Sequence, residues 1–121
     1  MGYVYVLATI LLTVYGQLIL KSRVAAYGAL PEGVLEATGF LLRLLLDPLI
    51  LSGLAAAFLA ALAWMAALTH LELSRAYPLM SLSFALVLAL SVWLLGEPLS
   101  VAKISGVALI VLGTIVIGYG R

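Results

Sequence analysis

The sequence contains no cysteine, only one histidine and few charged residues of either sign. Asp, Glu, Lys and Arg together make up 9% of the 121 residues, against about 25% in soluble domains. The missing cysteines exclude a disulfide framework, a thiolate metal site and a cysteine nucleophile. His70 has no second histidine with which to build a metal site. We therefore expect neither a metal nor another cofactor.

The shortage of charge also limits the environments in which the chain can fold. Hydrophobic residues make up 66%, against about 45–50% in soluble domains, so a water-soluble fold of this size would leave too much apolar surface exposed. The formal net charge of +1 gives no basic field for a phosphate backbone. A soluble enzyme, a disordered chain and a nucleic-acid binder are excluded. The composition predicts a multi-pass integral protein of the inner or plasma cell membrane.

Common catalytic motifs are missing as well. The sequence has no glycine-rich loop ending in Gly-Lys-Ser or Gly-Lys-Thr that would cradle the phosphates of ATP. No serine has a base partner in the sequence that would suggest a catalytic triad. We expect that the protein is not an enzyme.

The sequence does contain four long apolar runs. They cover residues 2–21, 49–69, 76–96 and 101–119. Each has about 18–21 residues, enough for a helix to cross a hydrocarbon core of about 30 Å. Helices are predicted because a helix satisfies its own backbone hydrogen bonds in lipid. The expected fold is an all-α membrane protein, one domain over residues 1–121, in which the first helix is retained and not cleaved as a leader.

The segment 31–47 differs from these runs because it is amphipathic. Its polar residues, including Glu32, Glu36, Arg43 and Asp47, fall on one face at about 100° per residue. One interpretation is an interfacial amphipathic helix that lies along the lipid head groups. The other is a helix packed against the transmembrane bundle, with its polar stripe facing water. Arg43 and Asp47 are four residues apart, so a weak ion pair is expected.

Polar side chains on the first and third runs are candidates for substrate binding. Polar groups on a transmembrane helix favour a neighbouring helix or a wet cavity over hydrocarbon, and an arginine offers a planar donor fork to a phosphate or carboxylate. Structural roles stay open beside this one: hydroxyls can bond to their own helix, and long basic side chains can reach the interface. The candidates are Thr13, Gln17, Lys21, Arg75, Tyr77 and Ser81.

The third and fourth runs are joined by a short connection that contains Glu97. This carboxylate is favoured by the dipole at the start of the next helix, for which Ser100 is a suitable N-cap; alternatively, it forms a gating ion pair with a basic residue. Gly106 and Gly113 are seven residues apart, so two helical turns put them on one face where another helix can approach closely. We expect this face to pack in a dimer.

Several stretches together resemble a known family. They are Gly-Gln-Leu-Ile-Leu-Lys at 16–21, Ala-Tyr-Pro-Leu-Met-Ser-Leu-Ser-Phe at 76–84, Gly-Glu-Pro-Leu-Ser at 96–100, and the glycines at 106 and 113. Their order and spacing resemble those of the small four-helix proteins of the drug/metabolite transporter superfamily, which include small multidrug resistance-like and EamA-like proteins. The resemblance covers nearly the whole chain, and the segment between the first two spans matches least.

Two branches of that superfamily imply different cargo. Small multidrug resistance proteins are antiparallel dimers that exchange protons for cationic drugs through a glutamate in the first helix. That position is Thr13 here, and the tryptophan of their third helix falls on Met80. The chain is more similar to the small subunits that flip aminoarabinose linked to undecaprenyl phosphate, in Gln17, Lys21 and the Tyr-Pro-x-x-Ser-Leu stretch.

This second resemblance implies a flippase for a polyprenyl-phosphate-linked sugar or a related lipid head group. Its partners would be membrane lipids and a second subunit, as a homodimer, antiparallel in arrangement, or as a heterodimer with a related four-helix chain. Lys21 and Arg75 would meet phosphate at opposite membrane faces. Two other functions stay open: an exporter of small molecules or cationic drugs that uses Glu97 as its counter-ion, and an accessory subunit that does not transport.

Overall fold

A computed structural model describes residues 1–119. Four of its helical segments are long and apolar enough to cross a membrane, namely Gly2–Tyr27, Pro48–Leu68, Leu73–Leu94 and Val101–Tyr119. The predicted all-α, four-span fold is confirmed. The third span consists of two helices, so the elements in chain order are α1 (Gly2–Tyr27), α2 (Val34–Leu44), α3 (Pro48–Leu68), α4 (Leu73–Met80), α5 (Leu82–Leu94) and α6 (Val101–Tyr119).

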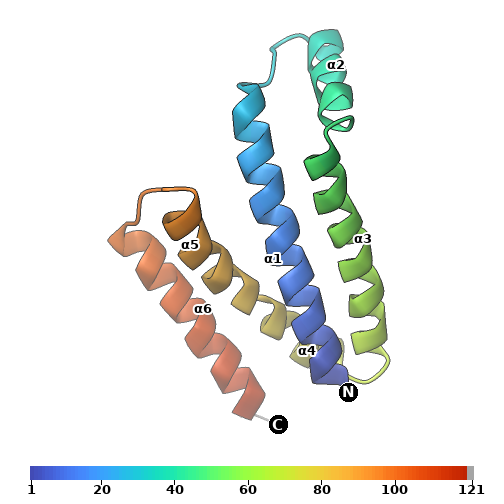
Figure 1. Cartoon of the computed structure of the whole chain (residues 1–121). Coiled ribbons are helices and arrows are strands. Elements are labelled where there is room, and N and C mark those ends of the chain that lie inside the picture. The colour runs from blue at the N-terminus through green and yellow to red at the C-terminus, as the bar shows by residue number, and fades with distance from the viewer. Residues whose placement is uncertain (120–121) are drawn as a thin grey trace.

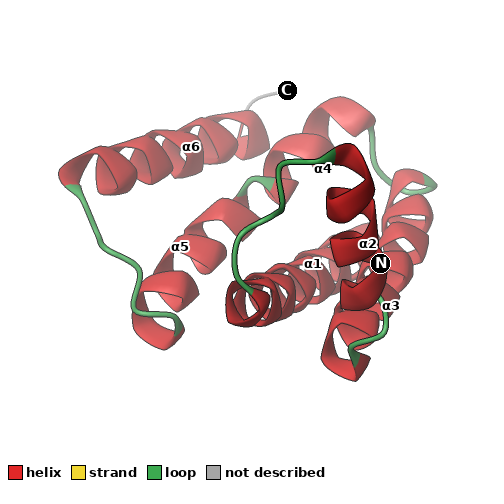
Figure 2. Cartoon of the chain, turned by 90° about the horizontal axis from the view of Figure 1, so that it is seen from above, coloured by secondary structure: helices red, strands yellow, loops and turns green. Residues whose placement is uncertain are grey.

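The spans form two antiparallel pairs that diverge from one end of the bundle. Figure 1 shows α1 beside α3, while α5 leads away from the start of α1 and α6 returns along it. The view from above separates the α5–α6 pair from the α1–α3 pair (Figure 2). α4 lies where the pairs meet and contacts α1, α3, α5 and α6. The start of α1 and the end of α6 therefore lie on the same side, as four crossings require.

Close packing of α1 against α3 depends on two glycines. A Cβ atom added to Gly16 would lie 3.0 Å from the carbonyl oxygen of Gly53, and one added to Gly53 would lie 3.3 Å from Cγ2 of Ile19. Without side chains at these positions the two backbones can approach, as small residues allow between transmembrane helices. The buried residues of α1 at the end nearer its start, among them Val6 and Ile10, pack with Ala67 of α3.

The first helix is longer than predicted. α1 continues past residue 21 to Tyr27, and at 1.5 Å per residue its first 20 residues already span about 30 Å. Its last turns are joined to α3 by Asp47, whose carboxylate accepts hydrogen bonds from Arg23 Nη2 at 2.8 Å and Tyr27 Oη at 2.8 Å. The expected pair between Arg43 and Asp47 is wrong, because Asp47 turns towards α1 and caps the start of α3.

The amphipathic segment forms a shorter helix than the predicted 31–47. α2 spans only Val34–Leu44, and Figure 1 shows it beyond the beginning of α3, near the end of α1. Its inner end is anchored, because Phe40 and Leu44 are buried with Ile50 of α3 and contact Leu20 of α1. This contact agrees with the second interpretation, a helix packed on the bundle. A position along the lipid head groups stays a prediction.

The third span is interrupted at Ser81, although the sequence predicted a continuous helix over 76–96. α4 begins at Leu73, so Pro78 lies inside the helix and not in its first turn. A proline there removes one backbone hydrogen bond and crowds the preceding turn. The chain tightens into shorter-range bonds, from Ser81 N to the Pro78 carbonyl at 3.0 Å and from Phe84 N to the Ser81 carbonyl at 3.0 Å. α5 then continues to Leu94.

Candidate functional site

A cavity of about 470 Å³ lies between α1, α3 and the α4–α5 break. Hydroxyl groups reach it from α1, through Thr9 and Thr13, and from the break, through Ser81 and Ser83. Aromatic residues form part of its wall, and two of them, Tyr77 and Phe84, are 67% and 59% exposed. The cavity is therefore open at the surface of the chain and carries polar groups in an otherwise apolar bundle.

Small residues on α3 create the space. Ala57, Ala60 and Ala61 line the cavity opposite the hydroxyls of α1, and a methyl side chain leaves room that a leucine would fill. Trp64 closes this wall and meets Tyr77 of α4 edge to face, with ring centroids 6.1 Å apart. Sequence reasoning missed the role of α3, although its alanine-rich stretch was the signal available.

The polar residues of α1 turn inward only in the first half of the helix. Thr9 is only 3% exposed, and its hydroxyl donates to the Tyr5 carbonyl at 2.8 Å. Thr13 lies one turn further along α1 and also lines the cavity. Gln17 does not: it is exposed and absent from the cavity wall. Two facts explain this position. Residues four apart on a helix are rotated by about 40° from one another, so each step turns the side chain further from the cavity. In addition, α5 diverges from α1 along the helix (Figure 1).

Ser81 belongs to a hydroxyl network that connects the break to α6. Its Oγ donates to the Pro78 carbonyl and lies 2.6 Å from Oγ1 of Thr114. Thr114 in turn lies 3.1 Å from the same carbonyl oxygen. Thr114 is the buried residue of α6, and it was missed because an isolated threonine in an apolar run gives no sequence signal. These hydroxyls donate hydrogen bonds to a backbone carbonyl at the break, which in a continuous helix would accept its hydrogen bond from within the helix.

The cavity continues towards the start of α4. A second hollow of about 720 Å³ shares Trp64, Tyr77 and Pro78 with the first and extends to Leu73 and Ser74. Arg75 follows in the next position of α4. A Cβ atom added to Gly2 would touch Leu71, which lies two residues before α4. The start of α4 therefore lies beside the start of α1. The structure thus places Tyr77 and Ser81 on one path and Arg75 close to its end.

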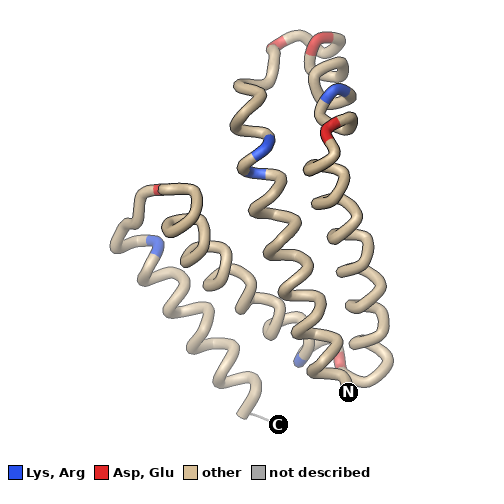
Figure 3. Tube along the Cα trace, viewed as in Figure 1, with Lys and Arg blue, Asp and Glu red and all other residues tan. Residues whose placement is uncertain are grey.

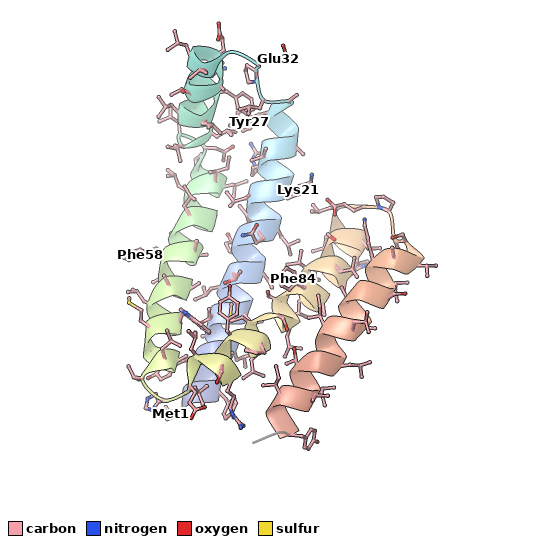
Figure 4. All side chains as sticks on the ribbon, turned by 180° about the vertical axis from the view of Figure 1, so that it is seen from behind. Met1, Lys21, Tyr27, Glu32, Phe58 and Phe84 are labelled. Carbon is pink, nitrogen blue, oxygen red and sulfur yellow. The ribbon has the colours of Figure 1, made fainter. Side chains whose placement is uncertain are left out.

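Lys21 lies at the opposite end, near the loop between α5 and α6. Its Nζ atom is 3.9 Å from Oε2 of Glu97, and Figure 4 shows Lys21 on the side of α1 that faces the α5–α6 pair. This is the ion pair that the sequence offered as an alternative role for Glu97. The structural alternative also holds in part, because Ser100 accepts from Lys103 N at 3.1 Å and caps α6.

Charged residues lie towards the two ends of the bundle (Figure 3). Lys21, Glu97 and Lys103 are at one end of the spans and Arg75 is at the other. The candidate residues therefore form no single cluster: Thr13, Tyr77 and Ser81 line the cavity, Arg75 follows Ser74 of the second hollow, and Lys21 lies outside both hollows, beside Glu97. Gly106 lines a separate groove between α5 and α6, and a Cβ on Gly113 would meet no atom within 4 Å.

Comparison with known proteins assigns the chain to a transporter family. Residues 1–119 match the EamA-like transporter family. The chain is 40% identical over 97% of its length to a protein of Aeromonas hydrophila named "Probable 4-amino-4-deoxy-L-arabinose-phosphoundecaprenol flippase subunit ArnF", covering 79% of that protein. A protein of the same name from Erwinia tasmaniensis is 39% identical over 97% of this chain and 94% of its own length.

A related subunit type also matches. The flippase subunit ArnE of Serratia proteamaculans is 38% identical over 93% of this chain and 90% of its own length. No solved structure matches the chain. The match over residues 1–119 agrees with the four apolar spans and with an integral, multi-pass position in the membrane. The protein belongs to the EamA-like transporter family.

Proposed function

We propose that the protein moves a polyprenyl-phosphate-linked sugar, or a closely related lipid head group, between the leaflets of a membrane. The observation that carries the proposal is the open cavity with hydroxyl groups from Thr9, Thr13, Ser81 and Ser83 within the apolar spans. A head group needs such a polar route, because a charged group in the bilayer centre costs at least about 2.5–3.5 kcal/mol. The prenyl tail can remain in the lipid.

The names of the relatives support the same cargo. They describe subunits of a flippase for 4-amino-4-deoxy-L-arabinose linked to phosphoundecaprenol. This head group combines a phosphate, an amine and sugar hydroxyls. Lys21 and Arg75 would bind the phosphate at the two ends of the path, and Thr13, Tyr77 and Ser81 would hydrogen-bond the sugar in between. In this role the protein is a transporter and not an enzyme.

The working unit is proposed to contain two chains. Relatives include both ArnE and ArnF subunits, which favours a heterodimer with a related four-helix chain over a homodimer. The cavity is open at the surface of the chain, and α6, which packs against α4 and α5, is a helix with a single buried residue. A second subunit against this helix would enclose the head group, and an antiparallel arrangement would make the two faces of the membrane equivalent.

Reconstitution in liposomes tests the proposal. The purified protein, alone and with a related subunit, is incorporated with the amino-sugar lipid, and an impermeant amine-reactive reagent labels the head groups in the outer leaflet. Movement between leaflets allows complete labelling, whereas protein-free liposomes retain a protected inner fraction. Lys21→Gln and Arg75→Gln should each slow labelling at least about tenfold, because a hydrogen bond to a charged group contributes about 1.5–3 kcal/mol.

Arg43→Gln is the matched control, because Arg43 lies on α2, outside the path. It should label at the wild-type rate. Normal movement in both the Lys21 and Arg75 variants would contradict the assigned roles, and no movement by either the single chain or the pair would contradict the function. A cation exporter is less well supported, because the residues that line the cavity include no acidic side chain.

A further inference from the structure

Another groove lies between α5 and α6 and shares one lining residue, Phe84, with the central cavity. It has a volume of about 360 Å³ and is lined mostly by apolar side chains, including Phe84, Val87 and Ile110. Gly106 contributes to the wall, and a Cβ there would meet no atom within 4 Å, so the space is open. The groove is thus an open, mostly apolar space between two spans.

One end of this groove carries three charged side chains of mixed sign. Glu97 and Lys103 line it, and the Lys21 ammonium is 3.9 Å from the Glu97 carboxylate. The Lys103 ammonium donates to the Pro98 carbonyl at 2.6 Å. The side chains of Lys21 and Glu97 are 63% and 33% exposed, so their ion pair contributes little to stability and is accessible to a ligand.

We infer that this groove is the subsite where a zwitterionic, lipid-linked amino sugar is loaded, and that Glu97 recognises its amine. The inference rests on the proposed function and deepens it. The phosphate, which is negative, would pair with Lys21 and Lys103. The sugar ammonium, which is positive, would pair with Glu97. The apolar groove below them would hold the first part of the prenyl tail.

The selectivity follows from charge balance. When Lys21 turns to the phosphate, Glu97 loses the partner seen in the structure. A head group with an ammonium replaces that partner, whereas a head group without one leaves a carboxylate unpaired at the edge of the membrane. A site that pairs with a polar group of its substrate rejects an analogue that lacks the group, because the group on the protein is then left without a partner.

Two lipids that differ only at the nitrogen test this inference. One carries the free amine and the other carries the N-acetylated, uncharged amine on the same sugar and prenyl chain. Binding to the purified protein in detergent is measured by competition, and movement in liposomes by an impermeant periodate that oxidises either sugar. Wild-type protein should prefer the free amine by about tenfold, the discrimination that about 1.4 kcal/mol provides.

Glu97→Gln should abolish this preference while the acetylated lipid still binds. Glu72→Gln is the matched control, since Glu72 is the residue before α4 at the other end of the bundle, and it should keep the wild-type preference. Equal binding of both lipids to wild-type protein, or an unchanged preference in Glu97→Gln, would overturn the inference. Absence of movement with an intact binding preference would instead overturn the proposed function alone.

The competing occupant is a helix of a neighbouring subunit. Gly106→Leu fills the groove and should weaken binding of both lipids without changing the preference between them. If this substitution alters the oligomeric state and leaves lipid binding unchanged, the groove is a helix-packing surface and the inference is wrong.

Discussion

At the scale of single residues, the carboxylate of Asp47, just before α3, accepts several hydrogen bonds from α1 and from the start of α3. Its side chain is 3% exposed and accepts hydrogen bonds from Nε and Nη2 of Arg23 at 3.0 and 2.8 Å. The Tyr27 hydroxyl and the first backbone N–H groups of α3 donate as well. The bonds from Arg23 contribute most, and together these donors lower the pKa of Asp47 from 3.8 to about 2.

This lowered pKa predicts a pH-dependent stability. The charged form of Asp47 is favoured in the folded protein, so its contribution is complete above 3.8 and is lost as the pH falls towards about 2. Asp47→Asn should lower the melting temperature at neutral pH and flatten the acid-induced decline, followed by circular dichroism in detergent. Glu32→Gln, in the loop before α2, serves as control and should keep the wild-type profile. A full acid decline in Asp47→Asn would contradict this role.

At the scale of the helices, the contact between α1 and α3 holds one side of the cavity in place. Thr9 and Thr13 project from α1 towards the alanines of α3 only because the helices approach at Gly16 and Gly53. For a Cβ atom added to Gly16, the nearest atom is the carbonyl oxygen of Gly53, and a backbone atom cannot move aside as the end of a flexible side chain can. Packing at this point is therefore sensitive to a single methyl group.

Two glycine-to-alanine substitutions should have opposite effects for this reason. Gly16→Ala brings a methyl group to 3.0 Å from the Gly53 oxygen, and overpacking of this kind typically costs about 1–3 kcal/mol. Gly39→Ala in α2 meets nothing within 4 Å and should gain up to about 1 kcal/mol of helix propensity. Thermal unfolding in detergent measures both. Equal stability of the two variants would show that the α1–α3 contact is not tight.

At the scale of the whole molecule, α6 and the α4–α5 span are the two least buried spans. α6 packs mainly on α4 and α5, and Thr114 is its buried residue. Large apolar side chains such as Leu109 and Val116 are 71% and 69% exposed. Lipid can cover such side chains, but the open space at Gly113 also admits a neighbouring helix. The predicted glycine face therefore remains available on the outside of the single chain.

Association through this face can be tested by filling it. Gly113→Leu should weaken pairing with a second subunit, measured by crosslinking in detergent or membranes, because the bulky side chain holds the helices apart. Gly118→Leu is the control: Gly118 is also open but lies on a different side of α6, since five residues rotate by about 140°. Equal pairing in both variants would place the interface elsewhere on the chain.

The sequence by itself determined the number of spans, their helical nature and the likeness to transporter motifs. These follow from local properties: apolar runs of sufficient length must become helices in lipid, because no water is available for the backbone. It also indicated that polar side chains of α1 such as Thr13 face away from hydrocarbon, and it offered an ion pair between Glu97 and a basic residue that it did not identify.

Only the tertiary structure decided which of these residues meet. Gln17 lies outside the cavity, where α5 diverges from α1. Thr114 of α6 supports the cavity wall from behind, because the helix break at Ser81 needs a hydroxyl partner from another helix. Asp47 forms its ion pair with Arg23 instead of Arg43, although Arg43 is nearer in the sequence. In each case the result depends on the distance between helices that are far apart along the chain, and periodicity within one helix carries no information about that distance.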